Sequence, residues 1–423
     1  MRFFATLALS GAVAVTASAA HACGAYFLRN PPATTTAIDA KLYNRSTRIV
    51  YARIGEATTV TMVADYRGNP REFAAVIAVP TVLTREQVRT VEAALVERID
   101  SATAPRFTVR QDPDPCFIRP SVSFGASKSR GAIPTGAVVV AASPQSSVTV
   151  EARYVVGEYD VAILSASESD GLRKWLDAEG YQVPAEAEPV LAAYIREGLK
   201  FFVAKVALAE GSTTEYKRLS PLQISYNSPN MWVPLRLSTV VAEGPQDMFV
   251  FALTDGSEIS AASMPTRVLD TTRELPAFVA RDFESFYEAA VTRAGRESNG
   301  AVAIVESRWR LPNAQAAQWA WKISIDELGK LGIDTARVTG SMLLTRLHVR
   351  YDKSFAKDLT LQAKPAQGRL VSNFRIHKPY QGEATCRAAA RYKTDVAAQY
   401  TREVDTLRRL TGWSLSEIKR RGG

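Results

Sequence analysis

Histidine and cysteine are scarce in this sequence of 423 residues, with three of each, and the scarcity limits its chemistry. A zinc site built on imidazoles would need both His348 and His377 together with a carboxylate, and there is no HExxH motif. A GxSxG motif and a glycine-rich phosphate loop are also missing. We therefore expect no cofactor and no metal, and we predict that both histidines are structural or surface residues.

Long apolar runs are absent beyond residue 22. Residues 74–83 are interrupted by Pro80, and residues 136–142 are too few, because a helix needs ~20 apolar residues to cross a bilayer. We expect no transmembrane span after residue 22. The hydrophobic content of 46% is ordinary for a globular chain, which excludes wholesale disorder.

The first 22 residues have the three parts of an export signal. Arg2 is the only charged residue, residues 3–15 are mostly apolar, and a small-x-small pattern ends at Ala22. We predict that residues 1–22 are a signal peptide cleaved between Ala22 and Cys23. The mature protein is then expected to be periplasmic or secreted.

A cysteine at the mature N-terminus raises the question of lipid attachment. Lipoprotein signals normally place Leu three positions before this cysteine, where Ala20 stands here, and the next residue is the bulky His21. A lipid anchor at Cys23 is therefore not expected.

Positive charge is concentrated at the end of the chain. Without Arg2 the chain has 51 basic and 43 acidic residues, and residues 386–423 alone have nine basic and four acidic ones. An anionic polymer or lipid surface is one candidate partner. A solvated helix face is the favoured interpretation of the tail, because its basic residues fall largely off its apolar stripe. Nucleic acid is not expected, since no recognisable binding module is present.

Alternating β-branched segments predict strands in two stretches of the chain. The first stretch includes residues 58–66, and the second includes residues 232–241 and 342–351. Thr84 and Gln87 have capping-box spacing, which predicts that a helix follows.

Helical spacing marks the middle and the end of the chain. Two short helices are predicted between residues 168 and 199, ended by Gly180 and Gly198. A long tail helix, stopped by Gly412, is indicated by a run of apolar residues at helical spacing, namely Val396, Tyr400, Val404, Leu407 and Leu410.

Together these patterns predict an α+β fold in which a helical hairpin joins two β-rich parts and a helical tail ends the chain. The expected units after the signal peptide are an N-terminal β-rich domain at 23–165, the hairpin at 166–200, a second β-rich domain with helices at 201–385, and the basic tail at 386–423.

The nearest match to a catalytic motif is Ser354-Phe-Ala-Lys357, which fits the SxxK of serine acyl-enzymes. A second match, from Ser416 to Lys419, shows how easily the pattern arises. The family that uses SxxK also needs an SxN after the serine and a KTG strand, and both are missing. An envelope hydrolase using Ser354 and Lys357 is therefore the alternative rather than the leading function.

Residues 112–116, Asp-Pro-Asp-Pro-Cys, form a rigid loop, because two prolines fix φ. Asp112 and Asp114 lack the further carboxylates of a calcium loop, so a turn with exposed acids is favoured.

Three cysteines in an oxidising compartment allow three pairs, 23–116, 23–386 and 116–386. We favour Cys116 with Cys386, because this pair would tie the tail to the N-terminal part. In the chain-entropy model, closing so long a loop restricts the unfolded chain strongly and so stabilises the folded one.

Several short segments resemble, in order, a bacterial family called domain of unknown function 2330. The opening Cys23-Gly-Ala-Tyr-Phe27 is similar to the family's Cys-Gly-Gly-Phe-Phe-Cys, although Leu28 stands in place of the second cysteine. The other segments are the hairpin 66–80, residues 156–161, Trp175-Leu176, Gly180-Tyr181, Thr345-Arg-Leu347, Tyr351, Asp358-Leu359 and Leu410-Thr-Gly-Trp413. The resemblance implies an exported bacterial protein and brings no activity or catalytic residues.

The leading function is a non-catalytic binding or assembly component of the envelope, whose partner is an envelope protein or polymer that the sequence does not identify.

Overall fold

The computed structural model describes residues 25–28, 46–64, 73–116, 148–206, 220–240, 242, 244–313, 316, 322–338 and 340–422. The predicted signal peptide, its cleavage site at Ala22 and Cys23, and the turn near residue 70 lie outside these residues. The described part is a mixed α+β protein, rich in sheet, with a long helix near the C-terminus.

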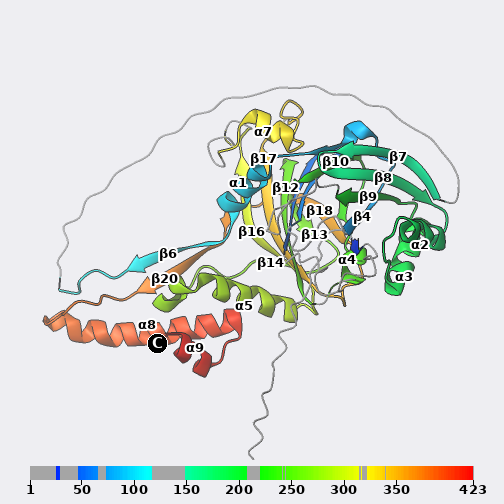
Figure 1. Cartoon of the computed structure of the whole chain (residues 1–423). Helices are drawn as coiled ribbons and strands as arrows, with labels where there is room; N and C mark the ends of the chain where they lie inside the picture. Colours follow the sequence, from blue (N-terminus) through cyan, green and yellow to red (C-terminus); the bar gives the residue numbers. More distant parts are fainter. Residues whose placement is uncertain are drawn as a thin grey trace, which may run out of the picture.

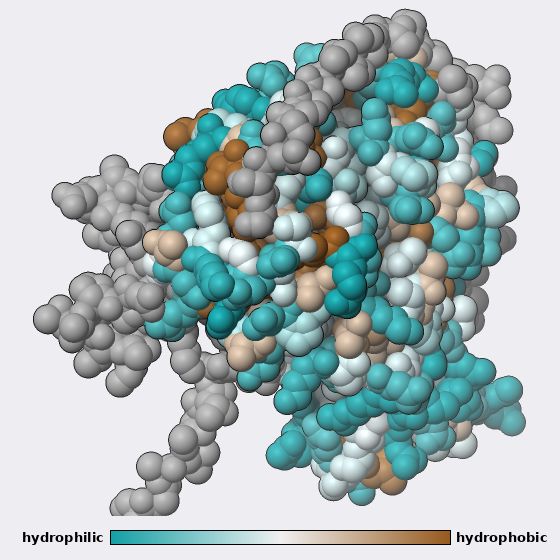
Figure 2. All heavy atoms as spheres, turned by 90° about the vertical axis from the view of Figure 1, so that its right-hand side faces the viewer, coloured by the Kyte–Doolittle hydropathy of each residue, from teal (hydrophilic) through white to brown (hydrophobic). Residues whose placement is uncertain are grey.

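A five-stranded antiparallel sheet forms one layer, in the order β1-β4-β9-β8-β7. Its strands are β1 (Ala25–Leu28), β4 (Phe73–Val79), β7 (Val148–Val156), β8 (Tyr159–Ala166) and β9 (Lys200–Val206). Three helices cover its outer face, α2 (Ser169–Ala178), α3 (Glu188–Arg196) and α4 (Arg236–Val240). Figure 2 shows this side of the molecule, which is largely hydrophilic with small apolar patches.

The second layer is a larger sheet in the order β14-β16-β17-β12-β2-β3-β10-β5, with β19 beside β16. Its strands come from both predicted β-rich parts, and β2 runs parallel to β12 at its centre. The two parts therefore share one sheet. The strands are β2 (Ser46–Ile54), β3 (Ala57–Ala64), β5 (Val88–Thr90), β10 (Leu222–Asn227), β12 (Gln246–Asp255), β14 (Thr266–Arg267), β16 (Val302–Leu311), β17 (Met342–Tyr351) and β19 (Leu370–Val371).

Both faces of the larger sheet are buried, which explains why its central strands are apolar at successive positions. In β2, Ile49 and Tyr51 point into the core between the two sheets, whereas Val50 and Ala52 pack on the opposite side. That outer core is covered by α1 (Ala93–Thr103) and α7 (Ile325–Lys330). A small sheet of β11 (Trp232–Val233), β18 (Leu359–Pro365) and β13 (Ser257–Ala261) contributes instead to the core between the two large sheets.

A third sheet carries the C-terminal helices (Figure 1). Its strands β6 (Arg106–Gln111) and β15 (Glu274–Pro276) flank β20 (Asn373–Lys378), and both run parallel to it. The helices α5 (Phe283–Arg296), α8 (Arg387–Thr411) and α9 (Leu415–Gly422) pack with it around a core that contains Phe286, Phe374 and Leu407.

Several local predictions are confirmed and two need correction. Strand 342–351 is β17, and Gly412 ends α8 with φ +76°. The capping box of Thr84 and Gln87 begins only a short 3-10 turn, after which β5 intervenes before α1. The predicted strand 232–241 is wrong after Val233, because Pro234 has no amide hydrogen for a ladder and α4 follows instead.

Candidate functional site

The C-terminal helix α8 is fixed to the body by its buried face and by a disulfide. The structure joins Cys386, at the start of α8, to Cys116, 270 residues away, with their Cα atoms 5.8 Å apart. This pair is the one favoured from the sequence. At the other end of α8, Arg293 of α5 donates a hydrogen bond of 2.9 Å to the backbone oxygen of Arg408. The interface between these two attachments contains the two features that suggest binding.

The first feature is a buried histidine held between two carboxylates. His377 lies on β20 with 2% of its side chain exposed. Its Nδ1 is 2.5 Å from Glu403 of α8, and its Nε2 is 2.7 Å from Asp112, directly after β6. The Tyr392 hydroxyl donates to Asp112 over 3.0 Å, and Arg110 pairs with the same carboxylate. The prediction of an exposed Asp112 is therefore wrong, because the carboxylate, 12% exposed, holds His377.

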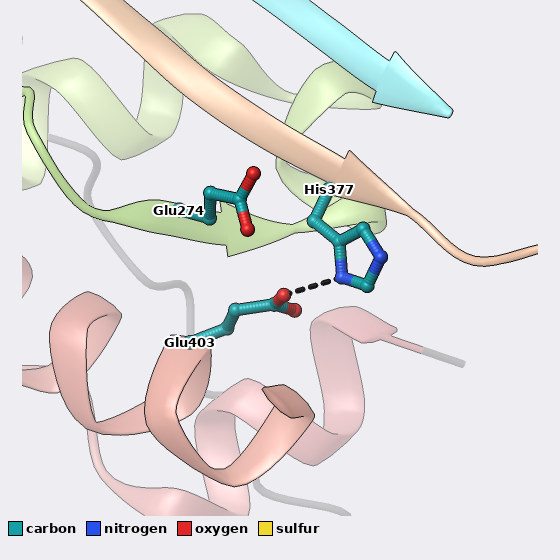
Figure 3. A group of neighbouring side chains, drawn as sticks. All are labelled: Glu274, His377 and Glu403. Atoms are coloured by element: carbon teal, nitrogen blue, oxygen red, sulfur yellow. Dashed lines mark hydrogen bonds and ion pairs between the residues drawn. The ribbon is translucent and has the colours of Figure 1, made fainter. Parts of the chain in front are cut away.

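A third carboxylate faces the same histidine from β15. Glu274 accepts hydrogen bonds from Arg110 over 3.0 Å and from Gln399 over 2.9 Å. One ligand atom each of Glu274, His377 and Glu403 lies within 4.8 Å of the other two. Figure 3 shows both carboxylates beside the imidazole ring. Burial, together with the nearby Glu274 carboxylate, raises the pKa of Glu403, against hydrogen bonds from Gln399 and His377 that lower it.

The other buried histidine, His348, also lies between two carboxylates, but there each carboxylate has an arginine partner as well. His348 lies 3.0 Å from Glu306 and 2.7 Å from Asp247. Each carboxylate is also ion-paired with an arginine, Glu306 with Arg346 and Asp247 with Arg350. By contrast, no lysine or arginine of the described residues forms an ion pair with Glu403.

The second feature is a groove lined by arginines beside the C-terminal end of α8. It encloses about 590 Å³. Its charged lining consists of five arginines and one aspartate, and Gly412 and Trp413 complete it. The arginines come from three elements of the structure: Arg273 precedes β15, Arg293 lies on α5, and Arg402, Arg408 and Arg409 lie on α8.

Two of these guanidinium groups have no ion pair among the described residues. Arg402 donates to the Gln399 amide oxygen, and Arg409 donates to the Thr406 hydroxyl and the Asp405 backbone oxygen. Arginine presents a planar fork of donors that matches the oxygens of phosphate and carboxylate groups. The groove can therefore bind an oxyanion without first breaking an ion pair of Arg402 or Arg409.

The residues of the acyl-enzyme alternative are not arranged for that chemistry. Ser354 and Lys357 are exposed, and the segment between them is not helical, so the lysine is not one helical turn from the serine. The Ser354 hydroxyl instead donates to Asp352 over 2.5 Å. Ser416 and Lys419 are exposed on α9.

Sequence reasoning missed Glu274, Glu403, Arg273 and Arg293. Only Glu403 gave a signal, because it falls on the apolar stripe of the tail helix, between Tyr400 and Leu407. An acid at a position that faces the core needs a buried partner. Nothing in the sequence indicates that this partner is His377.

The described fold is thus a sheet-rich α+β protein whose C-terminal helix carries a candidate binding site. The chain belongs to the family described as an uncharacterized protein conserved in bacteria (DUF2330), whose sequence model matches residues 17–362. The matched range includes neither His377 nor α8, so it does not extend to the tail segment 410–413, where the resemblance seen in the sequence ends. No curated protein and no solved structure matches the chain. Among the described residues, no helix has both the length and the apolar character to cross a membrane.

Proposed function

We propose that this protein is an exported, non-catalytic binding component of the bacterial envelope, and that its arginine groove binds a polyanionic envelope polymer. The observation that carries the proposal is the groove itself, where five arginines surround a hollow and two have no ion pair among the described residues. The leader of residues 1–22 supports a periplasmic or secreted location.

The positions of the tail arginines in the structure support a role in binding anions. A solvated face was the favoured interpretation, because the arginines fall off the apolar stripe of α8. In the structure Arg402, Arg408 and Arg409 are exposed, as that interpretation expects, and they also line one hollow together with Arg273 and Arg293. Like charges gathered in a concave site raise the local positive potential and attract anions. No such convergence supports the hydrolase alternative at Ser354 and Lys357.

The proposal is tested by titrating inorganic polyphosphate into the purified mature protein and measuring heat release. The double variant Arg402→Gln/Arg409→Gln should bind at least tenfold more weakly, because each hydrogen bond between charged groups contributes about 1.5–3 kcal/mol. Arg387→Gln/Arg391→Gln is the matched control, since it removes the same charge from exposed positions at the other end of α8. If both double variants lost polyphosphate affinity equally, the loss would reflect net charge alone, and this result would contradict a defined site.

A further inference from the structure

The side chains beneath α8 also form a site for a metal ion. We propose that His377, Glu274 and Glu403 bind one divalent transition-metal ion, through His377 Nδ1 and one oxygen of each carboxylate. The three ligands come from β20, β15 and α8 (Figure 3). This inference does not rest on anion binding by the arginine groove.

The geometry requires only a small adjustment to accept the ion. The three ligand atoms lie within 4.8 Å of one another. Ligand atoms bound tetrahedrally to zinc, each about 2.0 Å from the ion, lie about 3.3 Å apart. The ion would enter between His377 and Glu403 and replace their direct contact.

The surroundings of His377 already have the arrangement expected of a metal ligand. A ligating histidine usually donates its other ring N–H to a carboxylate, which fixes the tautomer and the ring orientation. Asp112 occupies this position, 2.7 Å from Nε2, and is held by Tyr392 and Arg110. The 2.5 Å contact between Nδ1 and Glu403 holds a proton. The ion would displace this proton to solvent, and with the other ring proton on Nε2 the Nδ1 lone pair would then bind the ion.

The excess of negative charge around His377 also favours a bound cation. When ionised, Asp112, Glu274 and Glu403 carry three negative charges, and among the described residues their ion-pair partners are Arg110 and His377 itself. A divalent ion beside a neutral His377 makes the formal charge of this group zero. At His348, where both flanking carboxylates have an arginine, no such deficit exists.

The ligand set narrows the class of metal. One imidazole nitrogen with two carboxylates suits Zn²⁺ or Mn²⁺, whereas Ca²⁺ and Mg²⁺ prefer sites made only of oxygen. Since the ligands join α8 to two strands of the body, the ion would secure the tail in parallel with the disulfide.

The test uses the tag-free mature protein with its disulfide intact and with Cys23→Ser, because a free thiol is itself a zinc ligand. After treatment with EDTA, the protein is titrated with Zn²⁺ and, separately, Mn²⁺ by calorimetry and thermal unfolding. We expect one ion per chain and a rise in Tm of about 2–4 °C. Glu274→Gln, which alters a partly exposed residue, should weaken binding at least tenfold, as should Glu403→Gln.

Asp247→Asn is the matched control, since it makes the same change beside the other buried histidine and should leave metal affinity unchanged. Arg409→Gln, which alters the groove without touching Gln399 or a metal ligand, should also bind the ion normally, and this separates the inference from the proposed function. Absence of stoichiometric binding by both ions would overturn the proposal, as would full affinity in the Glu274→Gln and Glu403→Gln proteins.

Discussion

Replacing Cys116 with serine would remove the covalent tie between the body and α8. Because the two cysteines are 270 residues apart, the chain-entropy model assigns the cross-link about 5–6 kcal/mol of restriction on the unfolded chain. This value is an upper bound, since real denatured chains keep some compact structure. We therefore expect Cys116→Ser to lower the free energy of unfolding by about 2–5 kcal/mol.

The assay is urea denaturation under non-reducing conditions, together with peptide mapping of the wild-type protein. Cys386→Ser should match Cys116→Ser, because either change removes the same bond, and Cys23→Ser should have little effect. Hydrogen exchange should become faster at the start of α8, next to the lost tie. A cross-link that contains Cys23, or unchanged stability of the Cys116→Ser protein, would refute the pairing and this account of tail attachment.

Three further predictions concern other parts of the chain. Burial alone would lower the pKa of His348, but Asp247 and Glu306 raise it from 6.5 to about 9. The raised pKa stabilises the folded protein by about 3 kcal/mol. This stabilisation should be complete below pH 6.5 and lost as the pH rises through about 9. A urea midpoint that does not fall between pH 6.5 and 9 would contradict it. Intact-mass measurement of the exported protein should show a chain that begins at Cys23, and a diacylglyceryl adduct would disprove the absence of lipid. Ser354→Ala should unfold like the wild type, and covalent labelling of Ser354 by a fluorophosphonate would revive the hydrolase alternative.

Local features of the fold could be predicted because they depend on neighbouring residues. The strand 342–351 has the apolar and β-branched character of a buried strand, and Gly412 adopts the positive φ that favours glycine at a helix end. Ser414 caps α9 through an equally local contact, accepting a hydrogen bond from the Glu417 amide over 3.1 Å.

The sheet order could not be predicted, because it depends on pairings between distant segments. The central parallel pair of β2 and β12 joins residues about 200 positions apart, and no local pattern specifies it. The candidate site could not be predicted either, because it also depends on contacts between distant segments. His377 meets Asp112 only because β20 pairs with β6, and it meets Glu403 only because α8 packs against this sheet.

The claim that the arginine groove binds an anionic polymer is tested most directly by locating the bound polymer. Hydrogen–deuterium exchange of the mature protein, with and without inorganic polyphosphate, measures which backbone amides the ligand protects. We predict protection at the C-terminal end of α8, around Arg408 to Trp413, and around Arg273. At the same polyphosphate concentration, this protection should be smaller in Arg402→Gln/Arg409→Gln. Protection confined to the five-stranded sheet and its helices α2 and α3, or equal protection in that variant, would contradict the proposed site.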